Sequence, residues 1–428
     1  MARAIGGIVT VGVWTGVEVR AIRTAALRLT QTELAERLGF TESVVRKWEK
    51  RGATITLTTQ HAGAMDTLLK RLDAEQRSRF NSACLESRTA TPTTGASRFD
   101  QPDAIVGQLQ DLSGVHGDGE LVDGFRLALD DIVDRYEAEG PRVLAVEARE
   151  LRHRANLLLQ QRRHPAYVES LYRIASRISG ALAYMAVNCG RFGTARMYCR
   201  EAQVMASFTD DREMLAWVKS TESFCAYYAG DFAEAAALAE QGIAMAETGS
   251  QAIRLYSNGL ARALGKLGDT ADVERSVEQA MALADRMNVT PGLTPALTFS
   301  SYGKARLLAN AATAFLSAGR FDKALEYGRL VNEYVSQSDS VWSRALVTLD
   351  VATALTLQRS PEIEQAVHFG IEALDASADR PIRSVWQRAN ELGALLEAHY
   401  PEPSRDYIER LAQWRRASRP LIAPESVR

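Results

Sequence analysis

The chain has 428 residues, of which 46% are hydrophobic and 24% are charged. This is ordinary globular composition, which excludes a disordered chain, and no apolar run approaches the ~20 residues of a membrane span. The formal net charge is −2, but residues 1–86 carry 13 Lys and Arg against 9 Asp and Glu, so a mildly basic head precedes an acidic body.

The opening residues 1–13 are apolar, but the apolar run is short and no cleavage-site pattern follows it. We therefore expect an N-terminal arm rather than an export signal. A disordered arm, an extra strand and an early start codon all remain open.

Residues 30–52, TQTELAERLGFTESVVRKWEKRG, predict two short helices joined by a tight turn. The first covers 31–38 and the second covers about 42–50. Gly39 supplies the left-handed backbone that ends the first helix. The hydroxyl of Thr41 is placed to cap the second helix.

Several side chains in this stretch favour a helix-turn-helix over a generic hairpin with a solvated charged face. Thr30 and Glu33 form a capping box, and Ala35 is small where the helices cross. The positions that face the core are all apolar: Leu34, Leu38, Phe40, Val45 and Trp48. The outward positions of the second helix are all polar: Glu42, Ser43, Arg46, Lys47 and Lys50. The charged outward face alone does not distinguish a helix-turn-helix from a generic hairpin. The combination of the capping box, the small residue at the crossing and the apolar core positions favours the helix-turn-helix.

The stretch resembles the lambda-repressor-like, or Xre/Cro, family of helix-turn-helix domains over roughly residues 14–80, so we expect a DNA-binding domain at 14–86. The resemblance implies a five-helix domain whose second motif helix enters the major groove of double-stranded DNA. It implies base or phosphate contacts from Gln31, Thr41, Glu42, Ser43 and Arg46. The natural phosphate contacts are Arg28, Lys47, Lys50 and Arg51. Glu42 departs from the family, whose best-known members carry Gln there; a carboxylate accepts from cytosine but repels phosphate.

Residues 87–102 are rich in Ser, Thr, Pro and Gly and predict a linker. The remaining 103–428 show a helical pattern, which repeats most clearly over about 170–377. Three segments share a glycine, a polar residue, Phe, two further residues and then Ala: NCGRFGTARMYCREA (188–202), YAGDFAEAAALAEQG (228–242) and SAGRFDKALEYGRLV (317–331). Two weaker copies occupy 266–280 and 358–373.

This pattern looks like the tetratricopeptide repeat, an antiparallel helix pair that stacks into a solenoid. Small residues stand seven positions before the anchoring glycines: Ala183, Ser223, Ala261 and Ala312. The predicted fold is therefore all-α, with an N-terminal five-helix helix-turn-helix domain joined to an α-solenoid. Residues 288–303 contain two prolines, which bar a continuous helix. The segment could be a hinge, a lid or a plain loop, and a plain loop is the expectation.

This domain order resembles bacterial cytoplasmic regulators that sense a signalling peptide or a small molecule in the solenoid. The resemblance implies a cytoplasmic homodimer on a palindromic operator, with no membrane association. An adaptor whose solenoid docks a protein partner is the alternative. We expect no enzyme, cofactor or metal, because the sequence has no phosphate loop, GxSxG, dinucleotide fingerprint, CxxC or HExxH.

Counting back from the glycines gives the positions that would face the solenoid groove. The ligand-binding candidates are Asn188, Trp217, Tyr228, Asn258, Arg262 and Arg306. Asn can pair with a peptide backbone and Arg with a carboxylate, although these could also be solvated groups on an empty groove. We expect dimerisation through the solenoid, whose last segment carries Trp386, Tyr400, Tyr407 and Trp414. The basic run 149–164 is interpreted as a surface helix rather than a phosphate contact.

Overall fold

The computed structural model describes residues 14–52, 55–73, 75–77, 79–80, 83, 102, 104–107, 118–161, 164–246, 249–335 and 340–422. The chain divides into two compact units, residues 1–99 and 100–428, and each is described by itself. The predicted arm (1–13) and the predicted linker, except residue 102, lie outside the described residues.

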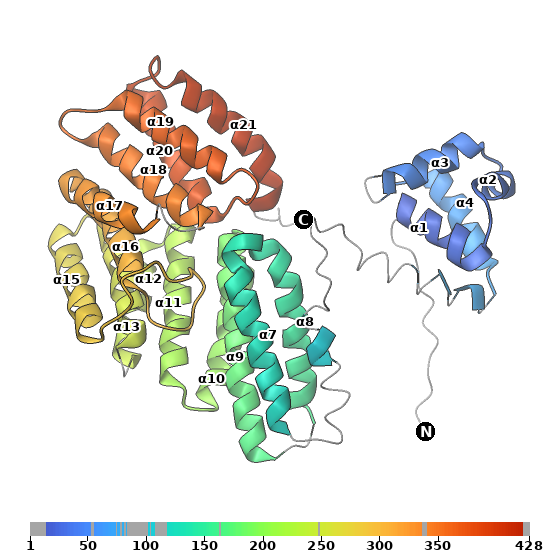
Figure 1. Ribbon diagram of the computed structural model, residues 1–428, viewed down its shortest axis with the longest axis horizontal. Coiled ribbons are helices and arrows are strands. Elements are labelled where there is room, and N and C mark those ends of the chain that lie inside the picture. Colours follow the sequence, from blue (N-terminus) through green and yellow to red (C-terminus); the bar gives the residue numbers. More distant parts are fainter. Residues whose placement is uncertain are drawn as a thin grey trace. The chain divides into compact units, whose positions relative to one another are not determined.

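The first unit is a small helical domain (Figure 1). Its helices are α1 (Gly16–Ala21), the π-helical η1 (Ile22–Leu27), α2 (Gln31–Leu38), α3 (Glu42–Arg51) and α4 (Thr59–Lys70). Helical residues 75–77 and 79–80 follow. Helices α2 and α3 are the two that the sequence predicts, with α3 one residue longer. The all-α prediction is confirmed for the described residues of both units.

The ends of these helices follow from local side-chain chemistry. The capping box of Thr30 and Glu33 is present at the start of α2, and Gly39, with a φ of 75°, ends it in the left-handed region. The predicted cap of α3 is wrong in detail. Thr41 stands at the N-cap, but its hydroxyl makes no capping bond; it lies 2.9 Å from the hydroxyl of Ser43 instead.

The core of the first unit forms where α1, α2, α3 and α4 meet. Leu34 and Val45 are fully buried and Trp48 is 4% exposed. Gly16 allows α1 to approach α3 closely, because a Cβ at this position would lie 1.9 Å from the carbonyl oxygen of Trp48. The fold therefore fixes the exposed face of α3 by packing its other face.

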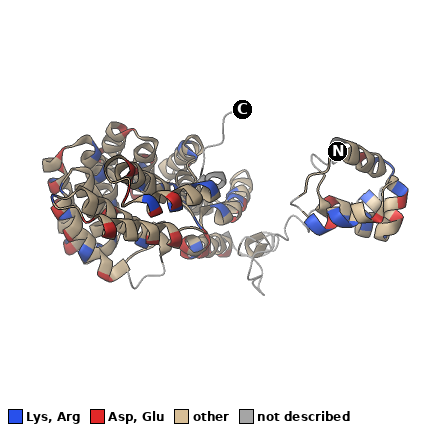
Figure 2. Ribbon diagram, turned by 90° about the horizontal axis from the view of Figure 1, so that it is seen from above, with Lys and Arg blue, Asp and Glu red and all other residues tan. Residues whose placement is uncertain are grey.

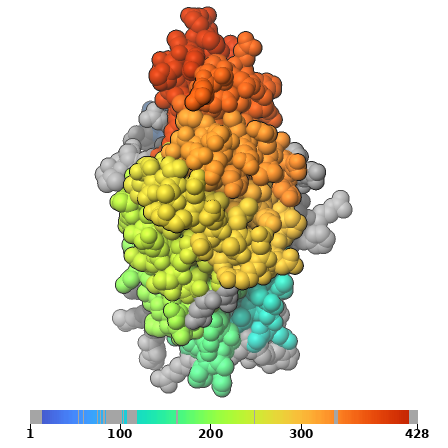
Figure 3. Space-filling view, turned by 90° about the vertical axis from the view of Figure 1, so that its left-hand side faces the viewer, coloured from blue at the N-terminus to red at the C-terminus, as the bar shows by residue number. Residues whose placement is uncertain are grey.

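The second unit is a stack of antiparallel helix pairs (Figure 1). In chain order its helices are α7 (Asp118–Glu139), α8 (Pro141–Leu159), α9 (Pro165–Asn188), α10 (Phe192–Ser207), α11 (Arg212–Ala229), α12 (Phe232–Met245), α13 (Ser250–Arg254), the π-helical η3 (Leu255–Leu260), α14 (Ala261–Leu267), α15 (Thr270–Arg286), α16 (Lys304–Ser317), α17 (Phe321–Val335), α18 (Val341–Leu357), α19 (Ile363–Ala376), α20 (Arg383–His399) and α21 (Arg405–Ile422). Figure 3 shows green, yellow, orange and red segments in succession, so each stretch of chain lies against the next.

The repeated glycines turn the chain between the two helices of a pair. Gly230 ends α11 with a φ of 93°, and Gly268 ends α14 with a φ of 83°. The aspartate after each glycine, Asp231 or Asp269, then caps the next helix by accepting a backbone N–H bond with its side chain. The small residues seven positions before the glycines are all buried: Ala183, Ser223, Ala261 and Ala312. The helical-repeat character of this region is thus confirmed.

The stack curves until its two ends meet. Helix α20 packs against α9, and the rings of Trp342 on α18 and Tyr136 on α7 lie 5.4 Å apart. Arg306 on α16 forms an ion pair with Glu137 on α7 at 3.1 Å. The inner face is therefore partly enclosed rather than an open groove.

Residues 288–303 contribute to this enclosure and are more than a plain connection. Leu297 is fully buried, and the Thr298 carbonyl accepts hydrogen bonds from Trp217 Nε1 (2.7 Å) and from Arg254 (2.5 Å). The backbone N–H of Ala296 donates to Glu137 at 2.7 Å. Polar groups of the inner face thus hold this segment in place.

Two other expectations concern the surface of the solenoid. The aromatic residues proposed for dimerisation do not form an exposed patch, because Tyr407 is 0% exposed, Trp414 is 5% exposed and the Tyr407 hydroxyl donates to the Ala389 carbonyl. The described part of the basic run lies on α8, with Leu151 buried and Arg152 paired with Glu201 at 2.6 Å, which favours the surface-helix interpretation.

Within the described residues, no helix is both long and apolar enough to cross a membrane.

Candidate functional site

One face of α3 is free of core contacts and carries most of the predicted DNA-binding side chains. The exposed residues on or beside α3 are Thr41, Glu42, Ser43, Arg46, Lys47, Lys50 and Arg51. Arg28 is also exposed and ends η1 in the left-handed region, with a φ of 55°. Figure 2 shows acidic and basic segments interleaved over this unit. The cations therefore lie at separate positions and do not form a uniform basic surface.

A buried carboxylate ties α3 to the helices behind it. Glu49 is 4% exposed and accepts two bonds from Arg23, at 2.6 and 2.8 Å. Gln31 donates its amide to the same carboxylate at 2.7 Å. The sequence predicts Gln31 as a DNA contact; the structure shows its amide N–H also holding α2 to α3.

Electrostatics favour the charged form of Glu49. Burial raises the pKa of its carboxyl, but the hydrogen bonds from Arg23 and Gln31 and the charges of Arg23 and Arg20 lower it by more. The net result is a pKa below the ordinary value. Glu49 is a satisfied structural anion, and its position in α3 gives no sign of this in the sequence.

Glu42, the departure from the family pattern, is exposed and held by two neighbours. Its carboxylate accepts a 2.9 Å bond from the hydroxyl of Thr32 on α2. Arg46 lies one turn further along α3, with an N–O separation of 3.9 Å to Glu42. Arg46, which the sequence predicts as a DNA contact, therefore has an acidic neighbour on the same face, which partly offsets its charge.

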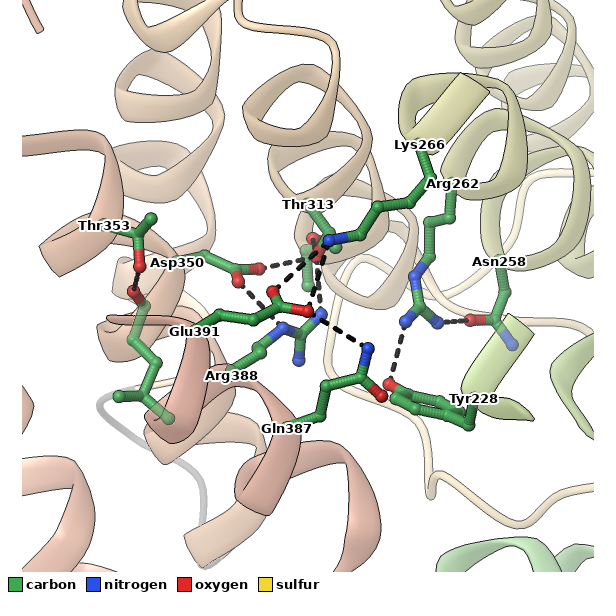
Figure 4. Close-up of polar contacts among 12 residues, drawn as sticks. Tyr228, Asn258, Arg262, Lys266, Thr313, Asp350, Thr353, Gln387, Arg388 and Glu391 are labelled. Carbon is green, nitrogen blue, oxygen red and sulfur yellow. Dashed lines mark hydrogen bonds and ion pairs between the residues drawn. The ribbon is translucent and has the colours of Figure 1, made fainter. Parts of the chain in front are cut away.

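The inner face of the second unit carries a partly open cavity of about 290 Å³. Its walls come from the first helices of successive pairs, with Tyr227 and Tyr228 on α11, Arg262 on α14 and Thr313 on α16. Further along the chain, α18 and α20 supply these lining residues: Asp350, Thr353, Leu357, Gln387, Arg388, Glu391 and Leu395. Figure 4 shows these polar side chains converging from several helices.

Two acid–base pairs occupy one side of this cavity (Figure 4). Arg388 contacts Asp350 at 2.8 Å, and Thr313 donates its hydroxyl to the same carboxylate at 2.6 Å. Burial raises the pKa of Asp350, and the charge of Arg388 and the Thr313 bond offset only part of that rise. Lys266 pairs with Glu391 at 3.3 Å. This pair is more exposed than the other.

Arg262 occupies the opposite side and has neutral partners. It donates to Asn258 Oδ1 at 2.5 Å and to the Tyr228 hydroxyl at 2.8 Å. Its guanidinium carbon lies 4.3 Å from the centre of the Tyr227 ring. The side chain is only 3% exposed. Its Nε is buried and has no hydrogen-bond partner.

A second cavity of about 70 Å³ shares Tyr228, Arg262 and Arg388 with the first. It is also lined by Asn188, Asn258 and Arg306. Five of the six predicted ligand residues therefore lie together around these two cavities. The roles themselves stay predictions.

Trp217 is the candidate that the structure does not bring to the cavities. Its side chain is 1% exposed, and its ring packs 4.8 Å from that of Phe299 in the 288–303 segment. Because Thr298 accepts its indole N–H, the segment covers the position that a ligand would occupy in an open groove.

Sequence reasoning did not assign ligand roles to Asp350, Arg388 and Glu391, which lie on α18 and α20. Neither helix belongs to a strong copy of the repeat, so no glycine register points to them. One signal was available. Asp350 is a lone acid in the apolar stretch ALVTLDVATAL, and a buried acid usually has a partner.

Comparison with known proteins bears on the first unit. A family model described as helix-turn-helix matches residues 19–59, which include α2, α3 and the turn between them. A search of curated proteins found no match. The chain thus carries a helix-turn-helix domain of the Xre-like type, which supports a DNA-binding transcriptional regulator.

Proposed function

We propose that this regulator binds a specific operator and that a small molecule or signalling peptide inside the second unit controls that binding. The observation that carries the proposal is the partly open cavity of about 290 Å³, lined by polar groups from five helices, in a chain with a helix-turn-helix domain. Ligand sites are typically concave and combine apolar walls with a few converging polar groups.

We further propose that the second unit is a tetratricopeptide-like solenoid. The glycine and aspartate junctions at Gly230 and Asp231, and at Gly268 and Asp269, support this assignment. In such a solenoid the first helix of each pair faces inward. The cavity is built from these inward helices, so a ligand there would contact several repeats at once.

Binding in the cavity can change the shape of the second unit. A ligand shifts a conformational equilibrium only by its difference in affinity for the two states. One that contacts α11, α14, α16, α18 and α20 favours the closed arrangement over any state in which these helices separate. We assign a binding role rather than a catalytic one, because Asp350 and Glu391 are both engaged by cations.

A homodimer on a palindromic duplex is part of the proposal. Helix α8 carries a stripe of exposed apolar side chains, Val143, Val146 and Leu157, and such a stripe suits a second copy of the chain. We expect Val146→Glu to give a monomer in light scattering of the full chain. If the wild-type chain is itself a monomer, the adaptor alternative is favoured, in which the exposed stripe on α8 binds a different protein.

The controlling experiment uses the full chain and a duplex selected from a random library. A fraction of host-cell extract below ~1 kDa should change the operator affinity of the wild-type protein. Asn258→Ala with Arg262→Ala should bind the operator equally well but not respond to the fraction. An operator affinity that responds only to a protein fraction of the extract would favour the adaptor instead.

A further inference from the structure

The two cavities contain four cations, and three of them have a carboxylate partner. Lys266 pairs with Glu391 at 3.3 Å, Arg306 with Glu137 at 3.1 Å and Arg388 with Asp350 at 2.8 Å. Among the described residues, no carboxylate lies within ion-pair distance of Arg262. Arg262 also lies between the cavities, since it lines both of them.

An arginine buried without an anion is costly, so its surroundings require an explanation. Asn258 and Tyr228 satisfy two of its N–H groups, but Nε has no partner. Asp350 contributes an attractive charge, yet its two oxygens already accept from Arg388 and Thr313. The protein itself therefore supplies no anion that contacts the Arg262 guanidinium.

Arg254 provides a comparison within the same inner face. It is also buried, at 1% exposed, and it donates to the Thr298 carbonyl. Its guanidinium lies 4.2 Å from the Tyr302 ring centre and 5.4 Å from that of Trp217. The 288–303 segment thus covers Arg254, which lines neither cavity. Arg262 differs because open space lies beside it.

We propose that the larger cavity binds a small monoanion, a carboxylate on a flat apolar body, and that the carboxylate pairs with Arg262. This inference rests on the proposed function and names the chemistry of its effector. The lining has three cations and two carboxylates, which leaves one positive charge for one negative charge on the ligand.

The walls beside Arg262 suit an apolar body. The rings of Tyr227 and Tyr228 lie beside Arg262, and Leu316, Leu357 and Leu395 are further apolar residues of the lining. Planar groups stack favourably on aromatic rings. A carboxylate bound to a guanidinium can form two parallel hydrogen bonds, which makes arginine a suitable partner for it.

The size of the cavity limits the occupant. Its 290 Å³ lies at the small end of the ~300–1,000 Å³ typical of ligand pockets, and corresponds to about ten waters. An extended peptide adds ~3.3 Å of length per residue, so a longer peptide would place only its end in this space and continue out through the open side. The carboxylate therefore comes either from a small organic acid or from the C-terminal residue of a peptide.

The more exposed polar pair marks the side from which a ligand enters. The Glu391 side chain is 46% exposed and that of Lys266 is 24% exposed, whereas those of Asp350 and Arg388 are 7% and 13% exposed. A carboxylate that passes the Lys266 ammonium reaches Arg262 one helical turn deeper on α14.

The test compares each acid with its neutral amide on the full-length protein. The probes are phenylacetate, 3-phenylpropionate and indole-3-acetate with their amides, and Ala-Phe with a free or an amidated C-terminus. Thermal shift and isothermal titration should show at least one acid that binds about tenfold or more tightly than its amide. The small acids and the dipeptide distinguish the two sources of the carboxylate.

Variants assign the effect to Arg262. Arg262→Met should abolish the preference for the acid, and Arg262→Lys should retain part of it. Arg254→Met makes the same change at a buried arginine outside the cavities and should keep the preference. If Arg262→Met does not fold, the acid–amide comparison in the wild type and in Arg262→Lys still decides the matter.

The outcomes separate this inference from the proposed function. Equal binding of acids and amides, stabilisation by inorganic phosphate alone, or an acid preference that survives Arg262→Met would overturn the carboxylate assignment. An acid that binds through Arg262 without changing operator affinity would support the assignment and contradict the control of DNA binding. An uncharged compound that changes operator affinity would support the control of DNA binding and contradict the carboxylate assignment.

Discussion

Each unit of this protein buries a charge, and the two are treated differently. In the first unit, the Glu49 carboxylate accepts from Arg23 and Gln31, with Arg20 close by. In the second, Arg262 has an amide, a hydroxyl and a ring as partners. The charge of Glu49, which holds helices of the first unit together, is neutralised by cations of the same unit. A charge left with neutral partners beside an open cavity is available to a ligand.

The strongest test of this comparison removes the satisfied anion. Glu49→Ala leaves Arg23 buried without its partner, and breaking a buried pair in this way costs ~3–5 kcal/mol. We expect the first unit to lose its protection from hydrogen exchange across α3 and the full chain to lose operator binding. The second unit should keep the exchange protection of the wild type.

Acidification should reproduce part of this effect. The folded-state pKa of Glu49 lies below its ordinary value, so its contribution to stability is present at neutral pH. That contribution disappears as the pH falls through the folded-state pKa. In Glu49→Gln, the hydrogen-exchange protection of α3 should depend less on pH in the acid range than in the wild type. An unchanged dependence would show that Glu49 does not act as described.

The matched change in the second unit should have the opposite character. Arg262→Met removes a buried charge that has no carboxylate partner, so the ligand-free protein should keep its unfolding midpoint or gain up to ~1–4 kcal/mol of stability. Arg23→Met, which strands Glu49, should instead destabilise the first unit. Urea unfolding followed by hydrogen exchange separates the units. A loss at Arg262 as large as that at Arg23 would break the comparison.

Exposed charges on α3 should affect DNA recognition with little change in stability. Arg46→Ala should relax the preference at one base pair, because a bidentate arginine–guanine contact discriminates by ~1–3 kcal/mol. Lys47→Ala should weaken all duplexes alike and reduce the salt slope by about one. Selection from a random duplex library measures both effects; identical selected sequences from Arg46→Ala and the wild type would remove Arg46 as the base reader.

The smallest effect concerns Glu42. Its exposed carboxylate partly offsets the charge of Arg46, and in a DNA complex it would repel the phosphates. Glu42→Gln keeps the hydrogen bond from Thr32 and removes the charge, so we expect affinity to rise about fivefold at low salt, on the order of 1 kcal/mol. The gain should shrink at high salt. Weaker binding by this variant would indicate that Glu42 itself accepts from a base.

Several features of both units could be predicted from the sequence because they depend on local chemistry. Thr30 with Glu33 and the left-handed Gly39 define α2 within a few residues of chain. The glycines before Asp231 and Asp269 mark helix junctions in the same way. Helical periodicity then places Asn258 of η3 and Arg262 of α14 on the same side of this continuous helix.

Other features depend on contacts between distant residues and could not be predicted. Glu49 is buried because Arg23 and Gln31 approach it from other helices, and nothing in α3 itself indicates this. The open groove expected from the repeat is closed, because α20 returns to α9 and the 288–303 segment folds over Trp217. Asp350 and Arg388 reach the cavity only through that closure.

The sequence by itself determined the helices, their junctions and the polar face of α3, since each follows from neighbours along the chain. The tertiary structure decided which buried charges are neutralised. Glu49 meets its cation across 26 residues of chain, whereas the Arg262 guanidinium meets an amide four residues away and a tyrosine hydroxyl 34 residues away. Such partners depend on the relative positions of packed helices, because charges interact through space and not along the sequence.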